Sequence, residues 1–179
     1  SDNDIIDISG GTQVESNLFH SFERFNPNEQ QTANFLTAPN TDAVIGQIVS
    51  GNTSIIDGLL QITGSDADLY LINPAGLLFG PNARLNLGGS FTATTAPHIG
   101  TNNQWFEVLN QPDYTNLITP PSHFGFSRLS TITNQGQLSV DQCQSLRLLA
   151  PQVINTGVLS APDGEITLFA ADPGQTIQL

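Results

Sequence analysis

The feature that most constrains this fold is a repeat in the last third of the sequence. Residues 132–139, Ile-Thr-Asn-Gln-Gly-Gln-Leu-Ser, recur 21 residues later at 153–160 as Val-Ile-Asn-Thr-Gly-Val-Leu-Ser. A period near 20 residues is typical of solenoids, in which each unit buries its apolar face only against its neighbours. One such period holds three strands of roughly 4–6 residues and three corners. The L-x-x-L-x-L-x-x-N pattern of leucine-rich repeats is absent, so the repeat predicts successive turns of a β-coil.

The same repeat predicts which side chains stack between turns. Leu138 should stack on Leu159 in one interior row, and Leu148 and Ala150 should meet Phe169 and Ala171. Each pair is separated by one period, so both members should face the same side of their strands.

Short strand-forming runs separated by sharp corners also fill residues 68–96. The apolar run at 69–72 stops at Asn73-Pro74, because Pro cannot donate to a strand ladder and holds the preceding residue extended. Gly76 follows, where the backbone can take a positive φ. The next alternating run predicts three side chains on the core side, Ala83, Leu85 and Leu87. Further strands are expected at 32–36, 44–49, 54–56 and 59–63.

Three ordered motifs resemble those of the haemagglutination-activity domain, the secretion (TPS) domain of filamentous haemagglutinin-like, two-partner-secretion TpsA exoproteins. Residues 73–83, NPAGLLFGPNA, resemble its NPNG-type motif, with Ala75 where the family usually has Asn. Residues 17–26 and 51–58 resemble two motifs that precede it. The resemblance implies structural-corner or transporter-recognition roles for Asn17, Phe19, His20, Phe22, Phe25, Asn26, Gly51, Asp57, Gly58, Asn73, Pro74, Gly76, Gly80, Asn82, Gly88 and Gly89.

The resemblance also implies an architecture. It predicts an all-β, right-handed parallel β-helix (β-solenoid) with an N-terminal cap and an extra-helical excursion. The expected parts of this single domain, 1–179, are a cap at 1–30, first coils at 31–96, an excursion at 97–122 and C-terminal coils at 123–179. The cap is expected because the first coil of a solenoid is otherwise exposed. The strand pattern lapses at 97–122, where a hairpin or short helix is expected around residues 105–109.

The resemblance implies a partner and a route. The expected partners are the POTRA domains and barrel of a TpsB outer-membrane transporter, and downstream repeats of the same exoprotein. The expected destination is the cell surface or medium, reached through the periplasm of a Gram-negative-type cell after removal of a signal peptide. A monomer is expected. The start of the sequence at Ser1 shows no basic, apolar signal segment, so the given chain is expected to be either mature or cytoplasmic.

The net charge of the chain limits which classes of partner are expected. Sixteen acidic residues face four Arg and no Lys, giving a net charge of −12. Nucleic acid and anionic membrane surfaces both require a cationic footprint, so both are disfavoured, whereas a basic protein partner is compatible. The apolar runs are too short to cross a bilayer. Cys143 is the single cysteine, which excludes an intramolecular disulfide and predicts a small buried side chain.

Two other functions compete with secretion. A β-helical polysaccharide enzyme needs paired carboxylates, and Asp66 and Asp68, two residues apart, would lie about 7 Å apart on one strand face. A carbohydrate-binding adhesin needs exposed aromatic rings, which Trp105, Phe106 and Tyr114 would supply. The chain offers no spacing typical of a metal or nucleophile site, and its three His are far apart in sequence. No catalytic role, cofactor or metal is predicted.

Overall fold

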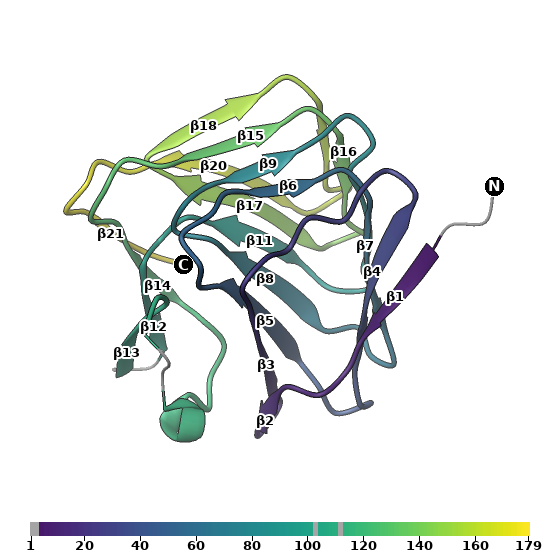
Figure 1. The fold of residues 1–179 in the computed structure, drawn as a ribbon, viewed down its shortest axis with the longest axis horizontal. Coiled ribbons are helices and arrows are strands. Elements are labelled where there is room, and N and C mark those ends of the chain that lie inside the picture. The colour runs from purple at the N-terminus through teal and green to yellow at the C-terminus, as the bar shows by residue number, and fades with distance from the viewer. Residues whose placement is uncertain (1–3, 102–103, 111–112) are drawn as a thin grey trace.

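The computed structural model describes residues 4–101, 104–110 and 113–179. Parallel strands stack as a β-solenoid of about six turns (Figure 1). Sheet A contains, in spatial order, β1 (Asp4–Ile8), β4 (Gln31–Leu36), β7 (Leu59–Thr63), β10 (Arg84–Asn86), β16 (Gln137–Ser139) and β19 (Val158–Ser160). Sheet B contains β2 (Thr12–Val14), β3 (Asn17–Phe22), β5 (Ala43–Ile48), β8 (Asp68–Ile72), β11 (Phe91–Thr94), β17 (Ser145–Ala150) and β20 (Glu165–Ala170). Sheet C contains β6 (Ser54–Ile56), β9 (Leu77–Phe79), β15 (Thr131–Asn134) and β18 (Gln152–Asn155). The predicted all-β parallel β-helix is confirmed.

The interior follows from the period of two along each strand. In β8, Leu69 and Leu71 turn into the solenoid, whereas Tyr70 and Ile72 turn outwards. The predicted alternation at residues 83–87 is confirmed, because Ala83, Leu85 and Leu87 all pack into the interior cluster. Sheet B is therefore apolar on both faces, as expected for parallel strands that are covered on both sides.

The stacking of the repeat agrees with the prediction in two sheets and differs in the third. Leu138 pairs with Leu159 as predicted. The predicted stacking of Leu148 on Phe169 and of Ala150 on Ala171 is wrong, since Leu148 pairs with Leu168 and Ala150 with Ala170. The corner before β17 spans residues 140–144, and the equivalent corner before β20 is one residue shorter, 161–164. A slip of one residue reverses the sides of a strand, so Phe169 follows Leu149 on the outer face.

The N-terminal segment combines covering strands with a strand of the solenoid. Strand β1 adds parallel to β4, and β2 adds antiparallel to β3. Strand β3 itself pairs parallel with β5, so the predicted cap at 1–30 includes part of the first coil. The boundaries at residues 30, 96 and 122, taken as limits of folding units, stay predictions.

An antiparallel sheet, sheet D, lies against the outer face of sheet B. It contains β13 (Gln104–Glu107), β12 (His98–Thr101), β14 (His123–Gly125) and β21 (Thr176–Gln178) in that order, and a 3₁₀ turn, η1 (Tyr114–Asn116), precedes β14 in the chain. Its inner side chains, among them Ile99, Phe106 and Phe124, form a second core with Ile45 and Leu149 of sheet B. The predicted C-terminal coils, 123–179, therefore include two strands, β14 and β21, that belong to sheet D. Figure 1 shows this sheet beside the coils.

Cys143 departs from its predicted burial. It is exposed in the corner between β16 and β17, where its φ is +65° and its backbone N–H donates to the carbonyl oxygen of Pro162. Among the described residues, no helix is long and apolar enough to cross a membrane.

Candidate functional site

Asn73 fills a corner between sheets B and C. Its Nδ2 donates to the carbonyl oxygen of Asn52 at 2.9 Å and to Oγ of Ser54 at 3.0 Å, and its Oδ1 accepts from the backbone N–H of Ala75 at 2.9 Å. The side chain is fully buried, and these bonds satisfy groups that the bend at Pro74 removes from the strand ladder. The amide of Asn73 therefore faces the corner.

Gly76 completes the same corner with a backbone that favours glycine. Its φ is +125°, and a β-carbon there would lie 3.2 Å from the carbonyl oxygen of Thr131 in the next coil. The side chain of Thr53, from the preceding coil, donates to the carbonyl oxygen of Ala75 at 3.1 Å. The NPNG-type motif is therefore held on both sides by neighbouring coils.

The first motif is mostly buried. Asn17 donates from Nδ2 to the carbonyl oxygen of Leu117 at 2.9 Å, and Phe19 stacks on Tyr114 with ring centroids 4.4 Å apart. Both contacts join strand β3 to the segment around η1. These two residues therefore anchor the excursion rather than present a surface to a partner.

The remaining aromatic residues of the first motif close the N-terminal end of the interior. The rings of Phe22 and Phe25 lie 4.9 Å apart, and His20 lies 5.7 Å from Phe35 of β4. Burial lowers the pKa of His20, because the charged imidazolium is disfavoured away from water. Among the described residues, its Nε2 has no hydrogen-bond partner.

The three motifs meet at one corner of the solenoid. Asn26 Oδ1 accepts from the backbone N–H of Ile55 at 2.9 Å, which joins the first motif to the second, and the Asn73 bonds join the second to the third. A shallow groove of about 230 Å³ lies here. Its lining, called the motif corner below, consists of Arg24, Phe25, Asn26, Asn52, Thr53 and Ser54.

A second corner contains Asp57, Gly80 and Asn82. Oδ1 of Asp57 accepts from the backbone N–H of Asn82 at 2.9 Å, and Oδ2 accepts from its Nδ2 at 3.1 Å. Gly80 leaves room for this carboxylate, since a β-carbon would lie 2.3 Å from Asp57 Oδ1. Gly58 likewise packs on the preceding coil, where a β-carbon would lie 2.3 Å from the carbonyl oxygen of Gln31. The close approach of neighbouring coils therefore explains why glycine occurs at positions 58 and 80.

Asp66 and Asp68 make different contacts at one corner of the solenoid. Asp68 accepts from the backbone N–H of Ser90 at 2.7 Å. The carboxylate of Asp66 lies over Gly88 instead, 2.2 Å from where a β-carbon would be, and Gly89 packs as closely on the carbonyl oxygen of Ala67, at 2.6 Å. Burial raises the pKa of Asp68, while the Ser90 bond opposes that shift. Both acids therefore contact the corner of the next coil, at residues 88–90.

Metal ligands are likewise not assembled. The described residues contain no group of three or more His, Cys, Asp or Glu side chains that could hold a metal ion. His20 lies in the interior, and His98 and His123 lie on sheet D.

Sequence reasoning missed part of the motif corner. Asn52 and Ser54 are partners of Asn73, and Arg24 lines the groove, yet none was singled out. The separation of Asn52 from Asn73 is 21 residues, equal to the period of the repeat. That spacing was a usable signal, because polar residues one period apart meet at the same corner. Arg24 carried no such signal.

The fold defines the class of small parallel β-solenoids, in which most of the signature residues are buried in corners. The TPS secretion domain family matches residues 1–179, and the chain belongs to that family, the secretion domains of TpsA-type exoproteins. The chain is also similar to the crystal structure of the HMW1 secretion domain from Haemophilus influenzae, with a TM-score of 0.67 and 26% identity. That match covers 90% of this chain and 40% of the other. A comparison with curated proteins gives no match. In general, domains of this family belong to secreted exoproteins that have a TpsB transporter as partner.

Proposed function

We propose that the POTRA domains of the TpsB transporter recognise this chain at the motif corner. The observation that supports this most directly is that one groove is lined by the first and second motifs and presents exposed side chains, Arg24, Asn26, Asn52 and Thr53. Asn73 of the third motif bonds to two residues of this lining, Asn52 and Ser54. Most other motif residues are buried. Ile55, beside the groove, is 53% exposed and supplies an apolar contact.

A free strand edge lies next to this groove. Strand β1 pairs only with β4 among the described strands, and Ile5 and Ile6 are exposed on it. A second hollow of about 240 Å³ runs from Ile6 to Arg24 and Asn26, so the edge and the motif corner are continuous. An unpaired edge accepts a strand from a partner through backbone hydrogen bonds. We propose that a POTRA strand adds to β1 while the motif corner fixes its register.

The proposed route runs through the periplasm, after removal of a signal peptide, and across the barrel to the cell surface. On the outside, the last coil would serve as a template for downstream repeats of the same exoprotein. Its strands expose apolar side chains, including Ile154, Val158 and Leu168. Leu168 continues the interior column that contains Leu148, and solenoid folding propagates between neighbouring coils.

We infer that the domain works by recognition and folding rather than by catalysis. The support is the structural use of Asp66 and Asp68 described above, together with the buried position of His20. The whole route needs only association, release and refolding.

The test is secretion of the full exoprotein from a Gram-negative-type host that co-expresses its transporter. Ile55→Asp should lower the secreted yield about fivefold or more while leaving the melting temperature of the isolated domain within about 2 °C, because the side chain is exposed. The matched control is Ile118→Asp, at 52% exposure and outside the motif corner. Equal secretion of both variants would contradict the proposal.

Association kinetics give an independent readout. A net charge of −12 predicts that the POTRA surface is basic and that its encounter with this chain is electrostatically steered. Raising salt should then lower the association rate more than it raises the dissociation rate. Association rates that stay constant from low to high salt would count against a charged docking surface.

A further inference from the structure

The outer face of sheet D carries two rows of side chains that the secretion role does not use. In one row, Glu107 pairs with His98, His98 with Gly125, and Gly125 with Thr176. In the next row, Trp105 pairs with Gly100, and Gly100 with His123. The intervening residues face the second core, so this face is the solvent side of the sheet.

Trp105 lies flat on this face because glycines form the floor. A β-carbon on Gly100 would lie 3.2 Å from Cε2 of the indole, and one on Gly125 would lie 3.6 Å from Cζ3. The ring also meets His123 edge-on, with centroids 5.9 Å apart. Its underside is supported while 52% of the residue stays exposed. The result is a fixed aromatic surface open to solvent.

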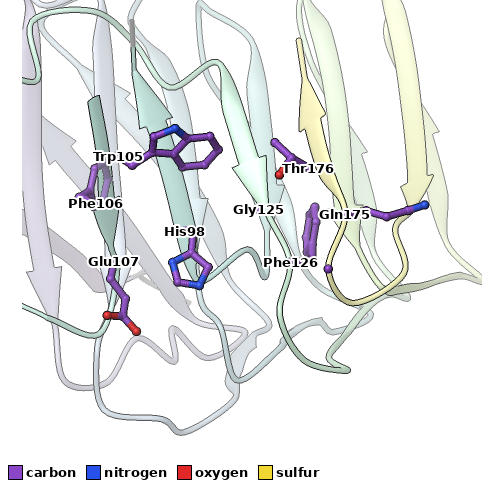
Figure 2. A pocket seen from close by; sticks show the side chains of 9 residues that line it. His98, Trp105, Phe106, Glu107, Gly125, Phe126, Gln175 and Thr176 are labelled. Atoms are coloured by element: carbon purple, nitrogen blue, oxygen red, sulfur yellow. The ribbon is translucent and has the colours of Figure 1, made fainter. Parts of the chain in front are cut away.

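A groove of about 510 Å³ runs beside the indole (Figure 2). Across it, His98 and Thr176 flank Gly125 from the two neighbouring strands. Two strand spacings separate those side chains, about 10 Å. The gap over Gly125 is therefore wide enough for one flat ring, with polar groups on both sides and the indole along one end. The far end is formed by Phe126, Gly174 and Gln175.

We propose that this groove is a saccharide-binding site that takes one uncharged sugar ring, stacked on Trp105 over Gly125. The C–H face of a pyranose is attracted by the negative face of an aromatic ring and loses water on contact. Its hydroxyl groups need neighbouring donors and acceptors, which the imidazole of His98 and the hydroxyl of Thr176 supply. A pocket of this size with few polar groups is typical of small-ligand sites.

The charged residues that line the groove favour a neutral sugar over an acidic or a cationic ligand. Among the described residues that line it, none is Arg or Lys, so an acidic glycan has no cation to bind. A cationic ligand is also disfavoured. Glu107 is the one lining carboxylate, and it accepts from Nδ2 of Asn110 at 2.6 Å. Phe106 and Phe126 are buried, and His123 meets the indole edge-on, so the described residues form no aromatic cage around a cation. A neutral sugar fits both observations.

Trp105 is the only tryptophan of the chain, so its fluorescence reports on this groove alone. The purified domain is titrated with neutral oligosaccharides of glucose, galactose, mannose, N-acetylglucosamine and N-acetylgalactosamine, with sialyllactose, heparin fragments and tetralysine as comparison ligands. We expect a saturable change in emission with at least one neutral oligosaccharide, in the millimolar to micromolar range. Saturation by an acidic glycan or by tetralysine alone would overturn the proposal and assign the face to a charged ligand.

Two variants test the geometry by calorimetry, which does not depend on the indole. Trp105→Ala should weaken binding at least about tenfold, because it removes the stacking surface. Gly125→Val fills the gap between His98 and Thr176 and also presses on Cζ3 of the indole, so it should weaken binding at least about tenfold as well. Leu129→Ala, which trims an exposed side chain elsewhere, is the control. Circular dichroism checks that each variant is folded.

The proposal fails if no neutral oligosaccharide gives saturable binding, or if Gly125→Val binds as tightly as the parent. Its outcome is separate from that of the transporter proposal. Trp105 lies outside the motif corner, so Trp105→Ala should be secreted at the parent level.

Discussion

The side chain of Asn17 donates from Nδ2 to the carbonyl oxygen of Leu117, 2.9 Å away and 100 residues later in the chain. Both residues are buried, and the neighbouring Phe19 stacks on Tyr114. The first strand of the solenoid and the segment before β14 are therefore one packed unit. The first motif therefore helps to hold the excursion, which follows much later in the chain, against the solenoid.

Asn17→Ala should lower the free energy of unfolding by about 1–3 kcal/mol, because the Leu117 carbonyl loses its buried donor. Urea unfolding measures this loss, and hydrogen exchange should show faster exchange around residues 113–117. The control is Asn86→Ala, whose bond to Gln61 is exposed, with an expected change within about 0.5 kcal/mol. Equal losses in the two variants would mean that the Asn17 bond does not hold the excursion.

Asn73→Ala should cost about 1–3 kcal/mol, since one truncation removes two donated bonds and one accepted bond from a buried corner. Secreted yield should fall with it. Ala75→Asn is the matched control, because it changes the adjacent, half-buried position toward the usual family motif and should leave stability near that of the parent. Thermal melting and secreted yield are measured for both. Full stability of Asn73→Ala would separate this motif from folding.

Much of the fold could be predicted because the packing contacts of a solenoid form between neighbouring coils. Each coil buries its side chains against the next, so the period of 21 residues and the alternation at 83–87 predict stacking directly. The error at Leu148 arose where corner length changes from one coil to the next, since a uniform period cannot show a one-residue deletion. The exposed Cys143 lies in that longer corner.

The candidate sites were harder to predict because they depend on long-range packing. Sequence spacing does not show that β21 pairs with β14, which brings Thr176 beside Gly125. Composition does not show that glycines support Trp105 from below. Periodicity predicts which apolar residues are buried, whereas it does not show that Asn26 and Asn52 line one groove.

Asp68→Ala should cost about 1–3 kcal/mol at pH 7, because the half-buried carboxylate accepts from the Ser90 backbone. Asp66→Ala, at an exposed residue of the same corner, should change stability by less than about 0.5 kcal/mol. Urea unfolding of the two variants checks the difference. Equal effects would show that the Ser90 contact does not distinguish these acids.

A charged residue in the interior row that contains Leu138 and Leu159 should lower stability by an amount that depends on the coil. Leu138 is fully buried, whereas Leu159, its partner in the last coil, is only partly buried. Leu138→Asp should therefore cost several kcal/mol, and Leu159→Asp clearly less, because the last coil leaves its aspartate near water. Melting temperatures test this order. If Leu159→Asp were the more destabilising change, the last coil would have to be covered in solution.

His20 gives the domain a predictable response to acid. It stands beside Gly46 in the register of β3 and β5, with its ring among Phe22 and Phe35. Because burial lowers its pKa in the folded state, the folded chain binds this proton less readily than the unfolded chain, whose pKa is about 6.5. Titration of His20 therefore does not lower the free energy of unfolding at pH values above 6.5. Below that value stability falls, by at most about 1.4 kcal/mol per pH unit, until the lowered folded pKa is reached.

His20→Phe removes the titrating group and keeps an aromatic ring in the cluster. Its melting temperature should fall less than that of the parent between pH 7.5 and 5.5, a window above the ordinary range of carboxyl pKa values. His123→Phe, on the outer face of sheet D, is the control for replacing an imidazole by a phenyl ring. The same acid response in His20→Phe and in the parent would assign the pH dependence to another group and show that the buried imidazole is not its source.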